Sequence, residues 1–511
     1  MIRMSGLLLT AGLWSLAACG GSGSDSGGVS ATAANSASST TRGSVISNMQ
    51  LASYEPAELL NLLGASTLGQ ELETLNFTPV CSVSVYQVDY DTVGGKGEAT
   101  TDSAAVMIPS GGGEGCSGAR PIVLYAHGTN PAKDFNIAEL SNSDDDEGVL
   151  LAVVFASQGY IVVAPNYAGY DDSTLPYHPY LVATQQSDDM IDGLAAARSV
   201  LPEAGVPAVS ASAALFITGY SQGGYVAMAT HRALQAAGMS VTASGPMSGP
   251  YALAAFGDAV FEGEVDLSAT ENITLLSSSY QNTYGNLYSS SPAELFASPY
   301  DDDVIGLLPS STPLVTLYAD NELPQNALFS STAPAAQYDS MTPATAPAEL
   351  APAFAMGFGT PFLITDSYRL AYLQDAQTNP DGGFPSLTNG LPAASPGNTL
   401  RQDLKTNDLR NWSPAAPVLL CGGDEDPDVF FLNLQLMQHY WGAHPGSATP
   451  VYVDLESSGS PYSTEKQEFA IAKAAVLAQG GSMAVLADYH ATLVPPFCLS
   501  IVKSFFDGYV N

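Results

Sequence analysis

Short, almost unbroken apolar runs recur along the chain and are separated by stretches with helical spacing. A strand with one face in water alternates apolar and polar residues, whereas these runs are apolar on both faces. The pattern therefore predicts an α/β fold in which a mostly parallel central sheet is covered by helices on both faces. The runs span residues 121–126, 160–164, 215–218, 417–421 and 450–454, with a further candidate at 241–247.

Helical spacing fills two intervals between these runs, at residues 187–200 and 225–237. From residue 250 to residue 411 the strand pattern is lost, and Ser, Pro, Tyr and Ala dominate. We therefore expect a core formed by residues 46–249 and 412–511. The region 250–411 is expected to be a cap or lid inserted into that core.

Aromatic side chains in the inserted region allow two interpretations. They would suit an apolar substrate pocket, or they would form the core of the cap itself. We favour the second interpretation, because it is the more common arrangement. The residues concerned are Tyr280, Tyr284, Tyr288, Phe354 and Phe358.

The first residues of the chain have the pattern of an export signal. One Arg precedes an apolar stretch of about ten residues, which is too short to span a bilayer as a mature helix. The stretch ends in Leu16-Ala17-Ala18-Cys19, which matches the lipobox of bacterial lipoproteins, although an ordinary signal peptide followed by a cysteine would look the same. We expect residues 1–18 to be removed and Cys19 to be lipidated. Residues 19–45, rich in Gly, Ser, Ala and Thr, are expected to form a flexible tether.

The charge balance excludes one broad class of function. The chain has 50 acidic residues against 14 Lys and Arg, so it carries a net charge of −36 and has little with which to neutralise phosphates. We therefore expect no nucleic-acid partner. Contact with a membrane is expected only through the lipid at Cys19, and the protein is expected to be a monomer in the cell envelope or secreted.

Four cysteines remain when Cys19 is set aside, which in an exported protein suggests two disulfides. Four cysteines allow three connectivities. We favour Cys81–Cys116 and Cys421–Cys498, because each pair lies within one terminal region of the chain. Zinc is not expected, because no C-x-x-C spacing occurs, and we expect no other metal and no cofactor.

A G-x-S-x-G motif at residues 219–223 lies between the apolar run at 215–218 and the helix at 225–237. The motif alone is weak evidence in a chain rich in Gly and Ser, but its position between a strand and a helix is specific. A sharp turn there lifts the serine hydroxyl out of the sheet, and the helix N-terminus faces a developing oxyanion. The position predicts that Ser221 is a nucleophile. The alternative is a glycine-rich turn with an idle serine.

A nucleophilic serine needs a base, and the chain has six histidines. His231 lies about 15 Å along the helix that follows the serine, which is too far. His127 is placed to shape a loop, and His178 lies in a Pro- and Tyr-rich loop. This chemistry usually places the base after the last strand, which favours His490. His444, which precedes the last predicted strand, is the alternative.

The acid that orients the base should lie between the serine and the base in the chain. Four carboxylates follow the run at 417–421, and the usual spacing G-x-x-D-x-x-V falls on Gly423, Asp426 and Val429. Asp426 is therefore the predicted acid, with Asp424 as the alternative. A calcium loop would also explain an acidic cluster, but no matching ligand pattern is present.

The oxyanion hole needs two backbone N–H groups. One is expected from Gln222, the residue after the nucleophile. The other is expected from Thr129, after the run at 121–126, with Asn130 as the alternative donor. In this scheme the base takes the serine proton as the serine attacks an ester carbonyl, and the acid fixes the imidazole tautomer.

Longer stretches of the chain resemble the secretory lipase group of the α/β-hydrolases. The likeness rests on VLYAHGT, GYIVVAPNYAGYDD, PYHPYLVATQQSDDMIDGLAAAR and FITGYSQGGYVAMA; it covers about residues 120–255 well and 415–495 moderately. It implies the α/β-hydrolase fold with a cap inserted after the sixth core strand. It also implies a catalytic triad of Ser221, Asp426 and His490.

The resemblance implies an activity as well as a fold. Members of this group hydrolyse carboxylic esters, often of lipids, so a neutral ester or lipid is the expected substrate. By the same analogy, Gly20 after Cys19 favours the outer membrane. A serine peptidase or polyester depolymerase of the same fold is the nearest alternative. A binding lipoprotein without catalysis is a more distant one, because a binding protein has no need of three catalytic residues.

Overall fold

The structure is a computed structural model that describes residues 41–65, 69, 77–113, 115–141, 147–201 and 209–510. The predicted signal peptide, the lipidation site Cys19 and most of the predicted tether lie outside the described residues. The chain contacts the core from Arg42 onward, inside the predicted 19–45 tether. The Arg42 guanidinium pairs with Asp188 and Asp192 at 3.0 and 2.9 Å, so residues at the end of that tether are already anchored.

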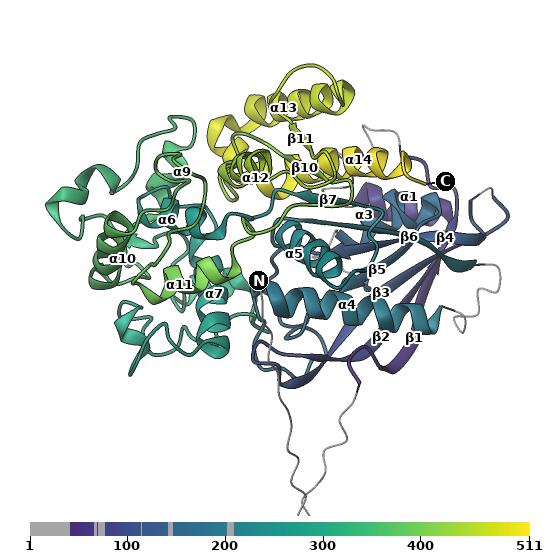
Figure 1. Ribbon diagram of the computed structural model, residues 1–511, viewed down its shortest axis with the longest axis horizontal. Helices are drawn as coiled ribbons and strands as arrows, with labels where there is room; N and C mark the ends of the chain where they lie inside the picture. Colours follow the sequence, from purple (N-terminus) through teal and green to yellow (C-terminus); the bar gives the residue numbers. More distant parts are fainter. Residues whose placement is uncertain are drawn as a thin grey trace, which may run out of the picture. The chain divides into compact units, whose positions relative to one another are not determined.

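One large sheet is formed by the strands β1 (Val45–Tyr54), β2 (Ser82–Val93), β3 (Ala99–Ser110), β4 (Gly118–Ala126), β5 (Ile161–Pro165), β6 (Val209–Tyr220), β7 (Ala243–Met247), β10 (Leu419–Gly422) and β11 (Val451–Asp454). Their order in the sheet is β1-β2-β3-β5-β4-β6-β7-β10-β11 (Figure 1). The strands from β5 to β11 in this order are parallel, and β1, β2 and β3 extend the β5 edge in antiparallel register. The predicted mostly parallel sheet is confirmed, and the six apolar runs fall on its six parallel strands.

The helices of the core cover both faces of this sheet. They are α1 (Pro56–Ala65), α3 (Glu147–Val154), α4 (Ala183–Val200), α5 (Gln222–Ala236), α12 (Leu432–Ala443), α13 (Ser463–Asp488) and α14 (Val494–Asp507). Helices α4 and α5 pack on one face, and α1, α3 and α14 pack together on the other (Figure 1). Both faces of the parallel strands are therefore buried, which explains why their sequences do not alternate.

The segment 250–411 lies between β7 and β10 in the chain, and its regular elements are mainly helices joined by long irregular stretches. It contains α6 (Leu253–Phe261), α7 (Ala269–Thr283), α8 (Leu314–Ala319), α9 (Ala351–Met356), α10 (Asp366–Thr378), α11 (Thr399–Asn407) and the short parallel pair β8 (Phe329–Ser330) and β9 (Phe358–Gly359). Tyr280 and Phe354 are completely buried, Tyr280 in contact with Leu181 and Phe354 in contact with Phe430, both outside the segment. These two residues are therefore packing residues, as in the favoured interpretation, but they pack the segment against the core, whereas Tyr284, Tyr288 and Phe358 are half-buried.

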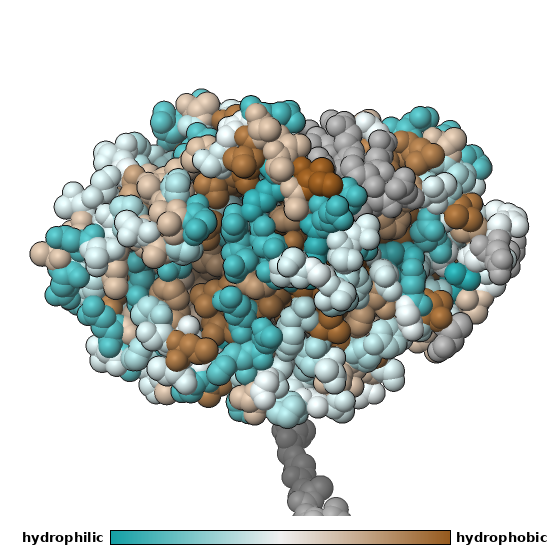
Figure 2. Space-filling model, turned by 90° about the horizontal axis from the view of Figure 1, so that it is seen from above, coloured by the Kyte–Doolittle hydropathy of each residue, from teal (hydrophilic) through white to brown (hydrophobic). Residues whose placement is uncertain are grey.

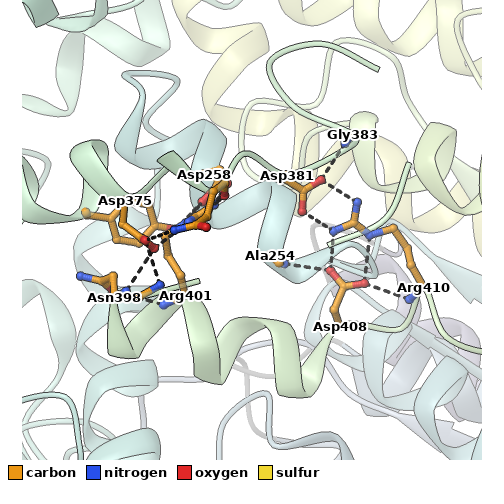
Figure 3. Close-up of polar contacts among 12 residues, drawn as sticks. Ala254, Asp258, Asp375, Asp381, Gly383, Asn398, Arg401, Asp408 and Arg410 are labelled. Atoms are coloured by element: carbon orange, nitrogen blue, oxygen red, sulfur yellow. Dashed lines mark hydrogen bonds and ion pairs between the residues drawn. The ribbon is translucent and has the colours of Figure 1, made fainter. Parts of the chain in front are cut away.

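Two arginine clusters fasten this segment, and Figure 3 shows both of them. In the first, Arg401 of α11 binds Asp258 of α6 through two nitrogens, at 2.8 and 2.7 Å, and Asp375 of α10 through a third, at 2.7 Å. The Arg401 and Asp258 side chains are only 3% exposed. Removing one partner of a buried ion pair typically destabilises a protein by about 3–5 kcal/mol. Because Arg401 pairs with residues of two other helices, the cluster holds three helices in fixed relative positions.

The second cluster lies where the segment returns to the core. Arg410 is fully buried and binds Asp381 and Asp408 at 2.8 Å each. The Asp408 carboxylate also accepts a hydrogen bond from the Ala254 N–H at the start of α6 (Figure 3). Both ends of the segment 250–411 are thereby joined through one carboxylate.

Two disulfides are present, with the expected pairing. Cys81–Cys116 joins the start of β2 to the turn before β4, and Cys421–Cys498 joins β10 to α14. The second bridge closes 77 residues of chain. In the chain-entropy model, a disulfide that closes a loop of this length stabilises the folded state by about 4–5 kcal/mol.

Helix α13 carries apolar side chains on its surface. Ile471, Leu477 and Met483 are 55%, 52% and 46% exposed. Figure 2, which views the molecule from the side where α13 lies in Figure 1, shows brown side chains there among teal ones. By length and composition alone, the helical stretch Ser463–Asp507 is apolar enough to cross a membrane, the single such stretch among the described residues. Its second half, α14, is nevertheless buried in the core of the fold.

Candidate active site

Ser221 lies at the sharp turn between β6 and α5. Its backbone has φ 57° and ψ −122°, a conformation that a residue with a side chain rarely adopts. The Ser221 N–H donates to the Met247 carbonyl at 3.0 Å, which ties the turn to the end of β7. A Cβ atom at Gly223 would lie 1.9 Å from the Ala126 carbonyl oxygen, and one at Gly219 would lie 2.4 Å from it. The two motif glycines therefore let α5 start directly against β4.

The predicted serine, base and acid meet in one row of hydrogen bonds. The His490 Nε2 lies 2.8 Å from the Ser221 Oγ, and the His490 Nδ1 lies 2.7 Å from the Asp426 Oδ2. A carboxylate can only accept, so the Nδ1 carries the hydrogen and the Nε2 is free to accept the serine proton. The three residues are brought together from three separate strand ends and loops.

The Asp426 carboxylate is fixed by the loop that follows β10. Its Oδ1 accepts the N–H groups of Asp428 and Val429, both at 3.0 Å, so the Oδ2 faces His490. Asp426 is 1% exposed, whereas Asp424 is exposed at the surface. The structure thus places Asp426, and not the alternative Asp424, against the imidazole.

His490 lies in a short π-helical turn, Tyr489–Leu493, between α13 and α14. The Tyr220 hydroxyl donates to the His490 carbonyl oxygen at 2.6 Å, and the two rings are 5.0 Å apart. The alternative base, His444, is exposed and stacks on Tyr440 at the end of α12. The G-x-S-x-G motif gives no role to Tyr220, because any residue can occupy the position before the serine.

The electrostatic surroundings of the site favour a proton on His490. Burial lowers the pKa of His490, but the adjacent charge and hydrogen bond of Asp426, together with the charges of Asp428 and Asp266, outweigh burial and raise the pKa overall. Burial instead lowers the pKa of His127 to about 4 and that of His178 to about 3. Among these three histidines, His490 is therefore the one whose pKa is raised.

The two residues predicted to form an oxyanion hole lie on either side of Ser221. Gln222 is the first residue of α5, and its side-chain Nε2 lies 2.8 Å from the His178 Nε2. Thr129 follows β4, and its Oγ1 lies 2.9 Å from the Tyr180 hydroxyl oxygen. Gln222 and Thr129 line the same cavity as Ser221, whereas the alternative donor residue, Asn130, is not among the described lining residues.

A cavity of about 330 Å³ opens at Ser221 and His490. One wall comes from the core, and the facing wall comes from α6, α7 and α11 of the segment 250–411. The facing wall is mainly apolar and includes Leu253, Phe256, Val260, Ile273, Leu276 and Leu404. The cavity can therefore hold an apolar group next to the serine hydroxyl.

Carboxyl groups that the sequence analysis did not single out also line this cavity. Asp266 and Glu271 come from the segment 250–411, and Asp428 from the loop of Asp426. Burial, reinforced by the charge of Asp428, raises the pKa of Asp266 to about 8 and that of Glu271 to about 7. No Lys or Arg is among the described lining residues. No motif marks the segment 250–411, so only the fold reveals these groups.

Comparison with solved structures decides the fold family. A rice cell wall degrading esterase, LipA of Xanthomonas oryzae, matches with a TM-score of 0.66 and 25% identity, over 92% of this chain and 100% of that chain. The chain has the α/β-hydrolase fold. A Legionella pneumophila protein to which hydrolase activity is ascribed matches with a TM-score of 0.61 and 19% identity, over 91% and 98% of the two chains. No protein-family model and no curated protein matches the sequence.

The α/β-hydrolase fold explains why distant residues converge. The carboxyl ends of parallel strands meet at one edge of the sheet, and loops at that edge carry the reactive groups. Thr129 follows β4, Ser221 follows β6, and Asp426 follows β10. The segment 250–411 leaves the sheet after β7 at the same edge, which is why its helices form a wall of the cavity.

Proposed function

We propose that this protein is a serine hydrolase that cleaves carboxylic esters through an acyl-enzyme. The single observation that carries the proposal is the row of hydrogen bonds from Ser221 through His490 to Asp426, with Ser221 and His490 at the wall of one cavity. The solved structure of LipA, an esterase with the same fold, supports ester hydrolysis at the level of the fold.

The reaction follows from the positions of these groups. The Ser221 Oγ attacks the ester carbonyl carbon while the His490 Nε2 takes its proton, and Asp426 stabilises the imidazolium that results. The N–H groups of Gln222 and Thr129 donate to the oxyanion of the tetrahedral intermediate. The imidazolium then gives its proton to the departing alcohol, which leaves an acyl group on Ser221. Water, deprotonated by His490, attacks this acyl group and releases the carboxylic acid.

The cavity limits the class of ester. Its apolar wall suits an acyl chain, and the segment 250–411 would act as a cap over the site. No Lys or Arg among the described lining residues could pair with an anionic group, so an anionic substrate is disfavoured. We therefore favour neutral carboxylic esters and lipids.

A substrate panel tests the reaction class. We expect hydrolysis of p-nitrophenyl butyrate and neutral triacylglycerols, with far slower release from the matched butyryl p-nitroanilide. Preferred cleavage of the anilide would favour a peptidase, and release of acid from polyester film above that from soluble esters would favour a depolymerase. Absence of turnover on every compound, with a folded protein, would favour a binding lipoprotein.

The pH profile of kcat/KM should report His490. The imidazole accepts the serine proton only when it is uncharged, so activity should rise as the pH rises through the pKa of His490. Because that pKa is raised above 6.5, the midpoint of the acid limb should lie above pH 6.5. In Asp428→Asn the midpoint should move to lower pH, because one of the charges that raise the pKa is removed. An acid limb that does not move in this variant would contradict the assignment.

We also propose that the protein acts outside the cytoplasm, in the outer membrane or secreted. The signal-like N-terminus and the lipobox cysteine Cys19 support this location. The two disulfides support it as well, since such bonds persist in oxidising compartments.

A further inference from the structure

The loop before α4 contacts both residues of the proposed oxyanion hole. Residues 176–182, PYHPYLV, precede this helix and place His178 against Gln222 and Tyr180 against Thr129. We propose that His178 and Tyr180 are positioning residues that hold the two backbone donors of the oxyanion hole at the distance the tetrahedral intermediate requires. This inference rests on the proposed function.

His178 is oriented so that it can only accept from Gln222. Its Nδ1 lies 3.0 Å from the Ala168 carbonyl oxygen, which must accept, so the Nδ1 carries the hydrogen. The Nε2 is left as an acceptor for the Gln222 side-chain N–H at 2.8 Å. The imidazole is 1% exposed, and the rings of Tyr167 and Tyr170 lie 5.5 and 4.7 Å from it. Burial lowers the pKa of His178 to about 3, so this acceptor persists throughout the neutral range.

The contact with His178 therefore restrains the Gln222 side chain and, through it, the Gln222 backbone. Gln222 is 1% exposed and begins α5 directly after the strained Ser221. Its backbone N–H belongs to the first turn of the helix, where no intrahelical acceptor is available. The side-chain bond to His178 resists sideways movement of this turn, and misplacement of a reacting group by about 1 Å can cost 10²-fold in rate.

Tyr180 holds the second donor in the same manner. Its hydroxyl donates to the Asn272 Oδ1 at 3.1 Å, so it accepts from the Thr129 hydroxyl at 2.9 Å. Asn272 belongs to α7 of the segment 250–411. One loop therefore joins both sides of the oxyanion hole and connects one of them to the cavity wall opposite the core.

The loop itself is rigid enough to serve as a reference. The Leu181 carbonyl accepts from the hydroxyl of Tyr280 on α7 at 3.3 Å, and the Tyr180 carbonyl accepts from the hydroxyl of Ser279 on the same helix at 2.9 Å. His178, Tyr180 and Leu181 are all at most 5% exposed. The loop is thus bonded to α7 at two carbonyls, in addition to the contact of His178 with Gln222 at the start of α5.

The test compares full-length variants on p-nitrophenyl butyrate and on a trifluoromethyl ketone, which forms a tetrahedral adduct with an active serine. In His178→Met, which keeps the volume but removes the acceptor, we expect kcat to fall about 10–100-fold with KM nearly unchanged. Inhibition by the ketone should weaken by a similar factor. His178→Gln, whose carbonyl can accept from Gln222, should recover much of the loss.

Two further variants identify the route of the effect. In Gln222→Met the backbone donor remains, and the loss should match that of His178→Met. The double variant should lose no more than His178→Met alone, because that change already breaks the bond between His178 and Gln222. Tyr180→Phe, which removes one hydroxyl, should lower kcat about 3–10-fold. If His178→Met does not fold, Gln222→Met and Tyr180→Phe decide the question.

His231 provides a matched control for the loss of a buried imidazole. It is also 1% exposed and hydrogen bonded, at 2.8 Å from the Ser244 Oγ, but lies away from Gln222. His231→Met should lower stability without changing kcat or ketone inhibition. Unchanged kcat and inhibition in His178→Met and Tyr180→Phe, or an additive loss in the double variant, would overturn the proposal. These results would leave the proposed function intact if Ser221→Ala still abolished hydrolysis, so the two failures are distinguishable.

Discussion

Replacing Ser221 with alanine is expected to lower kcat for ester hydrolysis by about 10⁶-fold and to leave the melting temperature nearly unchanged. The hydroxyl oxygen removed is the atom that attacks the ester carbonyl, whereas His490 and Asp426 keep their mutual hydrogen bond. Initial rates on p-nitrophenyl butyrate and a calorimetric melting curve measure the two quantities.

The chain contains its own control for this variant. The Ser244 Oγ lies 2.8 Å from the His231 Nδ1, and both side chains are buried. The other nitrogen of His231 has no hydrogen-bond partner among the described residues, and neither residue lines the cavity. Ser244→Ala should therefore retain wild-type rates. Hydrolysis that persisted in Ser221→Ala at more than a trace would refute the assignment of the nucleophile.

Replacing Asp426 with asparagine is expected to lower kcat by about 10⁴-fold. The amide oxygen can keep the two backbone hydrogen bonds of the Oδ1, so the loop should stay in place. The amide nitrogen would donate to the His490 Nδ1 and force the tautomer whose Nε2 cannot accept the serine proton. Because the Asp426 charge raises the pKa of His490, the remaining activity should also show an acid limb at lower pH.

Asp424→Asn separates the two acids that the sequence offered. Asp424 is exposed and makes no bond to His490 among the described contacts, so its variant should have wild-type kcat and pH profile. A large loss in Asp424→Asn together with a small loss in Asp426→Asn would transfer the role of acid to Asp424.

The parallel half of the sheet could be predicted because its strands are buried on both faces. The run at 121–126 is apolar at every position, and burial of both faces allows no other pattern. Strands β2 and β3 were not predicted. The sequence of β2, SVSVYQVDYDTV, alternates over much of its length, which is the signal of a strand beside a more polar face. A search for unbroken apolar runs passes over such a strand.

The segment 250–411 could not be predicted in detail, because its helices are short and are fixed by tertiary contacts. Helices α8 and α9 have six residues each, too few to be stable alone. The contacts of Arg401 and Arg410 that hold the segment together join residues far apart in the chain. For the same reason, the sequence could not predict that Asp266 and Glu271 of this segment line the cavity.

The candidate site was more predictable than the fold around it. In this fold the serine, the acid and the histidine follow particular strands, so they occur in a fixed order along the chain. That order, together with the spacing from Gly423 to Val429, can be read directly from the sequence. The contacts of Tyr220 with His490 and of His178 with Gln222 follow from no such spacing. The roles of Tyr220 and His178 depend on hydrogen bonds that only the folded chain defines.

The most direct test of the central claim is the labelling of Ser221 by a fluorophosphonate. The soluble chain from Gly20 onward would be treated, weighed intact, and digested to locate the adduct by peptide mass spectrometry. We predict one adduct, on Ser221, that is absent in Ser221→Ala and greatly slowed in Asp426→Asn. A folded protein that takes no label, or takes it on another residue, would contradict an activated serine at this site.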